Sequence, residues 1–128
     1  MNKQLKVLII NGSPRVGGNT SVALREMETV FNEQGVETEI VQIGAEPVRG
    51  CASCGYCYEH DRCVFDDVVN TLVPKFEAAD GLVVASPVYF ANANATLVAC
   101  LDRLFYSTGF DKTMKVGASV VCARRGGC

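Results

Sequence analysis

Residues 5–21 read LKVLIINGSPRVGGNTS and decide the fold. The apolar run at residues 5–10 is typical of a strand that is buried on both faces of a parallel sheet. A loop rich in Gly, Ser, Thr and Asn follows, and apolar residues recur at helical spacing from Thr20 onward. Such a junction of strand, loop and helix binds anions, because the first N–H groups of the helix are unpaired and its dipole is positive there.

The spacing within this loop selects among phosphate ligands. Gly12 and Gly17 are spaced as in loops that bind ATP or GTP, but Gly18 and Asn19 stand where those loops need Lys followed by Ser or Thr. Pro14 occupies the place of the second glycine in the dinucleotide fingerprint. The remaining prediction is a cradle for the terminal monophosphate of FMN, with the donors Ser13, Arg15, Asn19, Thr20 and Ser21. A polar connection without a ligand is the alternative.

Composition narrows the class of protein. The 128 residues fit one domain, and a formal net charge of −2 gives no reason to expect nucleic acid or an anionic membrane as a partner. No apolar run approaches the length of a membrane span, and residues 1–4 are not followed by the apolar core of a signal peptide. We therefore expect a cytoplasmic protein.

Apolar periodicity predicts strands that alternate with helices. The predicted strands are residues 5–10, 37–43, 81–86 and 115–123. The predicted helices are residues 20–34, a helix capped by Asp66 or Asp67 that Pro74 kinks or divides in two, and residues 95–106. Residues 44–50 and 87–94 are predicted connections. This alternation indicates a parallel sheet with helices on both faces.

Two stretches resemble motifs of the NADPH-dependent FMN reductases of the flavodoxin-like superfamily. They are the loop GSPR followed by GNT at residues 12–20, and SPVYF at residues 86–90. The resemblance implies a flavodoxin-like three-layer α/β sandwich, whose parallel sheet has the order 2-1-3-4-5 and whose ligand lies outside the carboxyl ends of the strands. Residues 1–128 would form one FMN-binding domain with a cysteine-rich insert at 51–63.

The predicted elements end after the fourth strand, where the family fold has a fifth strand and a last helix. We therefore expect the fifth strand to be absent, as in a fragment, a cleaved chain or a short family member. The strand at residues 115–123 would then be an edge that another chain or segment must cover.

The same resemblance implies which residues contact the flavin ring. The loop after the third strand would lie against the isoalloxazine with Pro87, Val88, Tyr89, Phe90 and Asn92, although Tyr89 and Phe90 taken alone could be ordinary packing groups. Arg124, Arg125 and Gly126 would reach the ring edge, where arginine stabilises anionic reduced flavin; an exposed basic turn is the alternative. Asp102 and Arg103 also match a family motif, and we interpret them as residues that position a loop or a subunit contact.

Four of the seven cysteines follow the pattern C-x2-C-x2-C-x5-C, which is Cys51, Cys54, Cys57 and Cys63. Without a secretion signal, this pattern favours metal, cluster or redox chemistry over disulfides. The run is similar to that of bacterial ferredoxins. Its spacing matches the iron–sulfur flavoprotein branch of the family, which implies these four residues as ligands of a [4Fe–4S] cluster. Zinc and plain thiols are the alternatives. Cys100 and Cys122 are predicted core residues, and His60 a solvated loop residue.

These features together favour an FMN-binding oxidoreductase. NAD(P)H would reduce the flavin, which would pass electrons to a small-molecule or protein acceptor, and no side chain need act as acid or base. A homodimer or homotetramer is expected. One alternative is an iron–sulfur flavoprotein that carries electrons between protein partners. Another is a zinc-stapled, non-enzymatic binding module.

Overall fold

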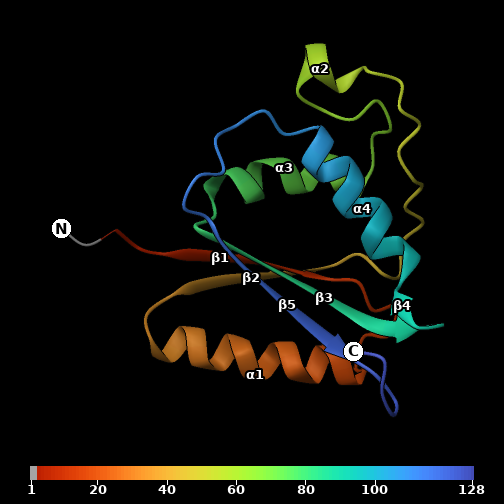
Figure 1. Cartoon of the computed structure of the whole chain (residues 1–128). Helices are drawn as coiled ribbons and strands as arrows, with labels where there is room; N and C mark the ends of the chain where they lie inside the picture. Colours follow the sequence, from red (N-terminus) through yellow and green to blue (C-terminus); the bar gives the residue numbers. More distant parts are fainter. Residues whose placement is uncertain (1–2) are drawn as a thin grey trace.

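The computed structural model describes residues 3–128 as a three-layer α/β sandwich (Figure 1). Its parallel strands are ordered β2-β1-β3-β5, with the bounds β1 (Lys6–Asn11), β2 (Glu37–Gln42), β3 (Gly81–Tyr89) and β5 (Val116–Cys122). A short strand, β4 (Asn92–Ala93), pairs antiparallel with the end of β3. One face of the sheet is covered by α1 (Asn19–Glu33), the other by α3 (Val68–Ala78) and α4 (Ala95–Tyr106).

The two faces of β1 explain why residues 5–10 form a continuous apolar run. Leu8 and Ile10 pack under α3 and α4 in the larger core cluster. Ile9, between them in the sequence, points to the opposite face and packs with Leu24 of α1 and Val83 of β3. Each of these fully buried aliphatic side chains contributes roughly 1.5–3 kcal/mol. Burial on both faces therefore fixes β1 in the centre of the sheet.

The predicted order of the sheet is confirmed, and the strand predicted as the fourth is β5. The prediction of a plain loop at residues 87–94 is wrong in part, because β3 continues to Tyr89 and folds back into β4 as a hairpin. Of the two outcomes predicted at Pro74, two short helices is wrong, since α3 runs through Pro74 as one helix, and a kink stays a prediction. Burial of Val69, Leu72 and Phe76 on this helix outweighs the roughly 3 kcal/mol that an interior proline costs.

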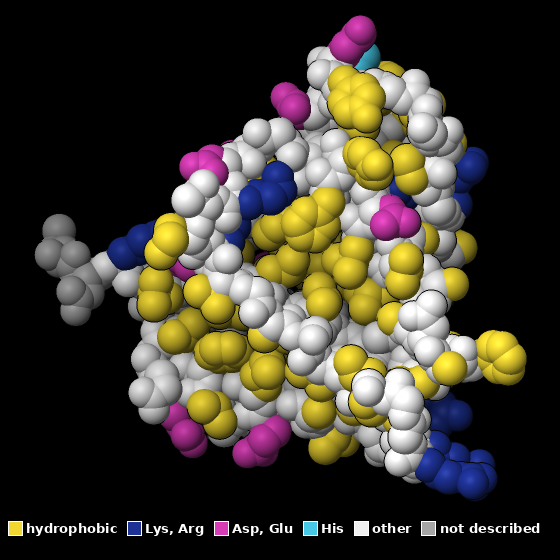
Figure 2. All heavy atoms as spheres, viewed as in Figure 1, with side chains coloured by type: hydrophobic (Ala, Val, Ile, Leu, Met, Phe, Trp, Pro, Cys, Tyr) yellow, Lys and Arg dark blue, Asp and Glu magenta, His cyan; other side chains and the backbone are white. Residues whose placement is uncertain are grey.

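The outer strand β5 is largely exposed, and within residues 3–128 no further strand pairs with its outer edge. Val116 of this strand is 72% exposed. Figure 2 shows hydrophobic side chains gathered over this side of the molecule. A groove of about 370 Å³ lies between β5 and α1, lined by Phe31, Met114, Val116 and other apolar residues. The prediction that another chain or segment covers this edge stays a prediction.

Candidate functional site

The loop after β1 is held in place by the side chain of Asn11. This buried amide donates a hydrogen bond to Ser21 Oγ (3.0 Å) and accepts one from the Ser13 N–H (3.0 Å). Ser13 Oγ in turn accepts a hydrogen bond from the Arg15 N–H at 3.2 Å. The loop therefore has a defined conformation in which its two ends are tied to each other.

The end of β2 supports the same loop from the side. Gln42 Nε2 donates to the carbonyl oxygens of Ser13 (2.8 Å) and Arg15 (3.0 Å). Gly44 follows, and a Cβ at this position would overlap the backbone of Gly12 and Ser13. Only glycine allows this close approach. Neither residue is among the predicted site residues, and a glycine directly after the second predicted strand is the one signal in the sequence.

Helix α1 begins at Asn19, and its N-cap is Gly18, which has no side chain to bond the first N–H groups. These groups at the positive end of the helix dipole are suited to an anion. Of the predicted phosphate donors, Ser13, Thr20 and Ser21 are buried at this junction, whereas Arg15 and Asn19 are exposed. The Ser21 hydroxyl is already engaged, because it accepts from Asn11 and donates to the Arg15 carbonyl (3.4 Å).

Asn94 joins this loop to β3 and α4. Its Nδ2 donates to the Gly12 carbonyl, and its backbone N–H donates to Ser86 Oγ at 2.8 Å. Its Oδ1 caps α4 by accepting from the Leu97 N–H. Sequence reasoning placed Asn94 at the end of a connection but assigned it no role. Its long-range bonds have no signature in the sequence beyond an asparagine that precedes a helix.

The hairpin between β3 and β4 carries the predicted ring contacts. Pro87 and Val88 are half-buried within it, and Tyr89 and Asn92 pair across its end. Phe90 at the tip is fully exposed, so it is not an ordinary packing residue in this chain. Phe90 and Ala91 have φ values of 45° and 63°. For residues with a Cβ this left-handed backbone costs roughly 1–2 kcal/mol each.

The residues after β5 lie beside this hairpin. Pro87 of β3 is in register with Cys122 of β5, so the two strands end at the same edge. A Cβ on Gly127 would lie 3.7 Å from Val88 Cγ1. The predicted ring-edge residues Arg124, Arg125 and Gly126 are exposed on this tail. The three predicted loops thus meet at the carboxyl edge of the sheet (Figure 1).

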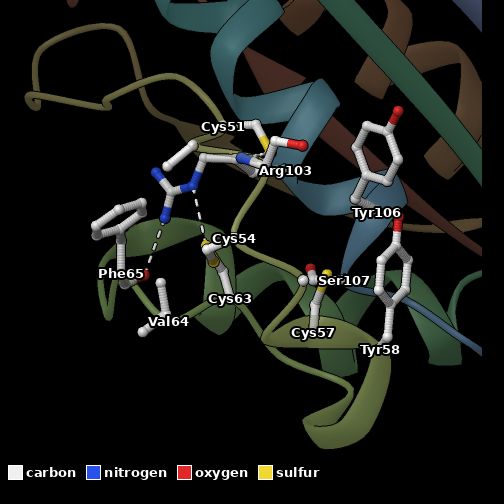
Figure 3. Close-up of a pocket in the computed structure, with 13 residues that line it drawn as sticks. Cys51, Cys54, Cys57, Tyr58, Cys63, Val64, Phe65, Arg103, Tyr106 and Ser107 are labelled. Atoms are coloured by element: carbon white, nitrogen blue, oxygen red, sulfur yellow. Dashed lines mark hydrogen bonds between the residues drawn. The ribbon is translucent and has the colours of Figure 1, made fainter.

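The four cysteines of the predicted cluster motif line one cavity of about 250 Å³ (Figure 3). All four are free thiols, with Cys51 and Cys54 exposed and Cys57 and Cys63 half-buried. Left-handed backbone at Ser53, Gly55 and Asp61 folds the segment back on itself around the short helix α2 (Cys57–His60), which the sequence did not predict. Tyr58 and Tyr106 stand at one side of the cavity.

The arrangement of these thiols is not that of a preformed site for one ion. Within residues 3–128, no three His, Cys, Asp or Glu side chains lie close enough together to hold a single metal ion. Zinc ligands converge to about 2.3 Å from the metal. The thiols share a cavity but do not converge on one point in this way.

Arg103 of α4 anchors the cysteine segment. Its Nε donates to Cys63 Sγ at 3.2 Å, and its two terminal nitrogens bind both oxygens of Asp67 at 2.8 Å each. They also donate to the carbonyl oxygens of Arg49 (3.1 Å) and Phe65 (2.9 Å). Arg103 therefore has a structural role, but the segment that it positions is residues 49–67 and not the loop after the third strand. The interpretation of Asp102 stays a prediction.

The partner Asp67 is the N-cap of α3, where it accepts from the Val69 N–H at 3.0 Å. Burial works against ionisation of Asp67. The hydrogen bonds from Arg103 and Val69, together with the Arg103 charge, outweigh burial and hold the pKa of Asp67 below its usual value. Arg103, which lines the cysteine cavity, is thus fixed in an ion pair with Asp67.

The other thiols and the histidine lie outside this cavity. Burial raises the pKa of the Cys100 thiol to about 12, which agrees with its prediction as a core residue. Cys122 is half-buried in β5. His60 is exposed and stacks on Tyr56, with ring centroids 3.8 Å apart, as expected of a solvated residue.

Helix α4 connects the two sites. Its cap Asn94 contacts the loop after β1, and Arg103 contacts the cysteine segment. They are nine positions apart along the helix, which corresponds to roughly 14 Å. The cysteine cavity and the loop cluster are thus distinct sites on one rigid element.

None of the helices in residues 3–128 has the length and apolarity to cross a membrane.

Comparison with known proteins identifies relatives of this chain. An iron-sulfur flavoprotein of Methanosarcina thermophila is 42% identical over 127 residues, which cover 96% of this chain and 66% of the relative. Another, of Methanocaldococcus jannaschii, is 36% identical over 126 residues, which cover 96% of this chain and 65% of the relative. The chain therefore spans about two thirds of the length of these relatives.

Solved structures share the fold. RosB with a bound 8-demethyl-8-formylriboflavin-5'-phosphate superposes with a TM-score of 0.74 at 20% identity, over 96% of this chain and 54% of the other. An NAD(P)H:quinone oxidoreductase from Methanothermobacter marburgensis superposes with a TM-score of 0.69 at 17% identity, over 94% and 66%. The family model of the NADPH-dependent FMN reductases matches residues 5–128, from β1 through the cysteine segment to the tail. The chain therefore belongs to the NADPH-dependent FMN reductase family.

Proposed function

We propose that this chain is the FMN-binding part of an NAD(P)H-dependent flavin oxidoreductase. The observation that carries this proposal is the junction between β1 and α1. There a loop fixed by Asn11, Gln42 and Gly44 leads into a helix whose N-cap has no side chain. Such a junction fits a terminal monophosphate, and the family match supports FMN as the molecule that carries this phosphate.

In this proposal, each loop has a separate task. Ser13, Thr20 and the first N–H groups of α1 hold the phosphate, with Arg15 and Asn19 at the rim, while Ser21 holds the loop. The hairpin of β3 and β4 places Pro87, Val88, Tyr89, Phe90 and Asn92 beside the ring. Arg124, Arg125 and Gly126 lie next to the hairpin and would contact the ring edge. When bound, FMN supplies the hydride and electron transfer, and the chain binds it, orients it and excludes water.

We also propose that Cys51, Cys54, Cys57 and Cys63 hold an iron–sulfur cluster, of the [4Fe–4S] type. Their common cavity and their spacing support this, as do the names of the two relatives described above. Four cysteine thiolates are the ligand set that a [4Fe–4S] cluster would require, and these four residues line one cavity.

The family match also supports proposals for the acceptor and the assembly. We propose a small-molecule electron acceptor, a homo-oligomer and a cytoplasmic location. A second candidate function is electron transfer to a protein partner. It is favoured by the position of the cysteine cavity at the far end of α4 from the flavin loops, with exposed Tyr58 and Tyr106 at its side.

The deciding experiment is anaerobic purification followed by flavin, iron and sulfide analysis and an NADPH oxidation assay. We expect one FMN and a cluster per chain in the wild type. Cys54→Ala should remove iron and leave FMN bound, because the phosphate loop is elsewhere. A protein that binds FMN but takes up no iron would refute the proposed cluster and leave the proposed reductase function standing. A protein that binds neither would refute both.

A further inference from the structure

Arg103 is the only charged side chain among residues 3–128 that is almost fully buried, at 1% exposure. A buried cation is costly unless it is paired and hydrogen-bonded. Arg103 meets this condition completely. The five N–H groups of its guanidinium face five acceptors, namely two oxygens of Asp67, the carbonyls of Arg49 and Phe65, and Cys63 Sγ.

Four of these bonds account for a structural role, because they join α4 to residues 49–67. The fifth is different in kind. A neutral sulfur is a weak acceptor, whereas hydrogen bonds with an ionised partner are roughly twice as strong as neutral ones. A permanent cation whose Nε–H is aimed at Cys63 therefore fits a cysteine that works as a thiolate.

Cys63 is also fixed through its backbone. Its N–H donates to Asn70 Oδ1 at 2.9 Å, and its carbonyl accepts from Asn70 Nδ2 at 3.0 Å. Cys51 and Cys54, by contrast, lie on the exposed part of the segment. The last cysteine of the motif is thus held in position from both sides, and one of its restraints carries a positive charge.

We propose that Arg103 is a positioning residue that orients Cys63 as a cluster ligand and, through the Nε–H···Sγ bond, raises the reduction potential of that cluster. This inference rests on the proposed cluster function. Hydrogen bonds to ligand sulfurs and nearby positive charge favour the reduced cluster, which has gained one electron and is more negative. Asp67 opposes this effect because its carboxylate neutralises the far side of the guanidinium.

Because Arg103 and Asp67 carry opposite charges, removal of each charge should shift the reduction potential in opposite directions. The cluster would be loaded anaerobically into the wild type and into Arg103→Gln, and the midpoint potential measured by redox titration with electron paramagnetic resonance. At a fixed potential, Arg103→Gln should lower the ratio of reduced to oxidised cluster about tenfold, a shift of 59 mV for a one-electron couple. Asp67→Asn leaves the Arg103 donor in place and should shift the potential upward.

Two further variants separate charge from structure. Arg103→Lys keeps the charge but cannot reproduce the five-donor fork, so its potential should lie between those of Arg103→Gln and the wild type. Arg62→Gln removes an equal charge next to Cys63 at an exposed position. Solvent screening should leave its potential near that of the wild type.

The outcomes are distinct. Equal potentials in the loaded wild type, Arg103→Gln and Asp67→Asn would overturn this inference alone, as would shifts of the same sign in both variants. If neither Arg103 variant takes up iron, the Asp67→Asn variant still tests the inference: an upward shift of its reduction potential supports it, and a downward shift overturns it. A wild type that takes up no iron overturns the proposed cluster and this inference together. If that protein still binds FMN, the proposed flavin oxidoreductase function stands.

Discussion

Arg103 Nε donates a hydrogen bond to Cys63 Sγ at 3.2 Å, across 40 residues of sequence. Arg103 belongs to α4, and the cap of that helix, Asn94, binds the carbonyl of Gly12 in the loop after β1. One helix therefore fixes both the proposed flavin loop and the cysteine segment.

The hydroxyl of Thr20 is the sharper probe of phosphate binding, because the Ser21 hydroxyl also holds the loop together. Thr20→Val should weaken FMN binding by about 1.5–3 kcal/mol, the value of a hydrogen bond to a charged group. Riboflavin, which lacks the phosphate, should bind unchanged in a flavin fluorescence titration. Thr29→Val on the exposed side of α1 is the matched control. Equal losses for FMN and riboflavin would place the phosphate elsewhere.

Gly44 should tolerate no side chain, because a Cβ there would overlap the Gly12 and Ser13 backbone. Gly44→Ala should lower the free energy of unfolding by about 1–3 kcal/mol and weaken FMN binding. Both can be measured, by urea titration and by flavin titration. Gly50→Ala is the control, since a Cβ at Gly50 meets open space. Similar behaviour of the two variants would show that the loop moves freely past the end of β2.

Asp67 should make stability depend on pH. Its folded-state pKa is lowered, so it lies below the unfolded value of about 3.9. Its stabilising contribution is therefore present above pH 4 and is lost as the pH falls through the folded-state pKa. Asp67→Asn leaves Arg103 without its counterion and should cost about 3 kcal/mol at pH 7.

Chemical denaturation of the wild type and Asp67→Asn from pH 7 to pH 2 tests this dependence. The difference in unfolding free energy should shrink below pH 4, where the wild type loses its own carboxylate. Asp66→Asn, on an exposed ion pair with Arg62, should differ little from the wild type at any pH. A constant gap between the wild type and Asp67→Asn would mean that the ion pair contributes nothing to acid stability.

The sheet order and the main helices could be predicted because each rests on a local pattern. The alternating burial of Leu8, Ile9 and Ile10 on two faces appears in the sequence as one apolar run. The hairpin was missed because its turn uses Phe90 and Ala91 at positive φ, where Asn or Gly would have given a signal. The first three strands and α4 were predicted to within a few residues for the same local reason.

Long-range contacts explain what the sequence could not supply at the sites. The motif identified the four cysteines as a group, and they line one cavity. The bond from Arg103 to Cys63 and that from Asn94 to Gly12 join residues 40 and 82 positions apart. Neither leaves a spacing that a single sequence reveals. These contacts form only when the connections between the strands bring distant residues together in the folded chain.

The exposed tip of the hairpin combines backbone strain with an aromatic side chain, and the two can be separated. Phe90→Gly should raise the free energy of unfolding by about 0.5–1 kcal/mol, because relief of the left-handed backbone (about 1–2) exceeds the entropy cost of glycine (about 0.5–1). The same variant should bind both FMN and riboflavin more weakly, since the aromatic face beside the ring is lost. Ala91→Gly has the same backbone change without an aromatic loss, so it should gain similar stability and bind flavin normally. If Phe90→Gly binds FMN as tightly as Ala91→Gly does, the Phe90 side chain does not contact the flavin.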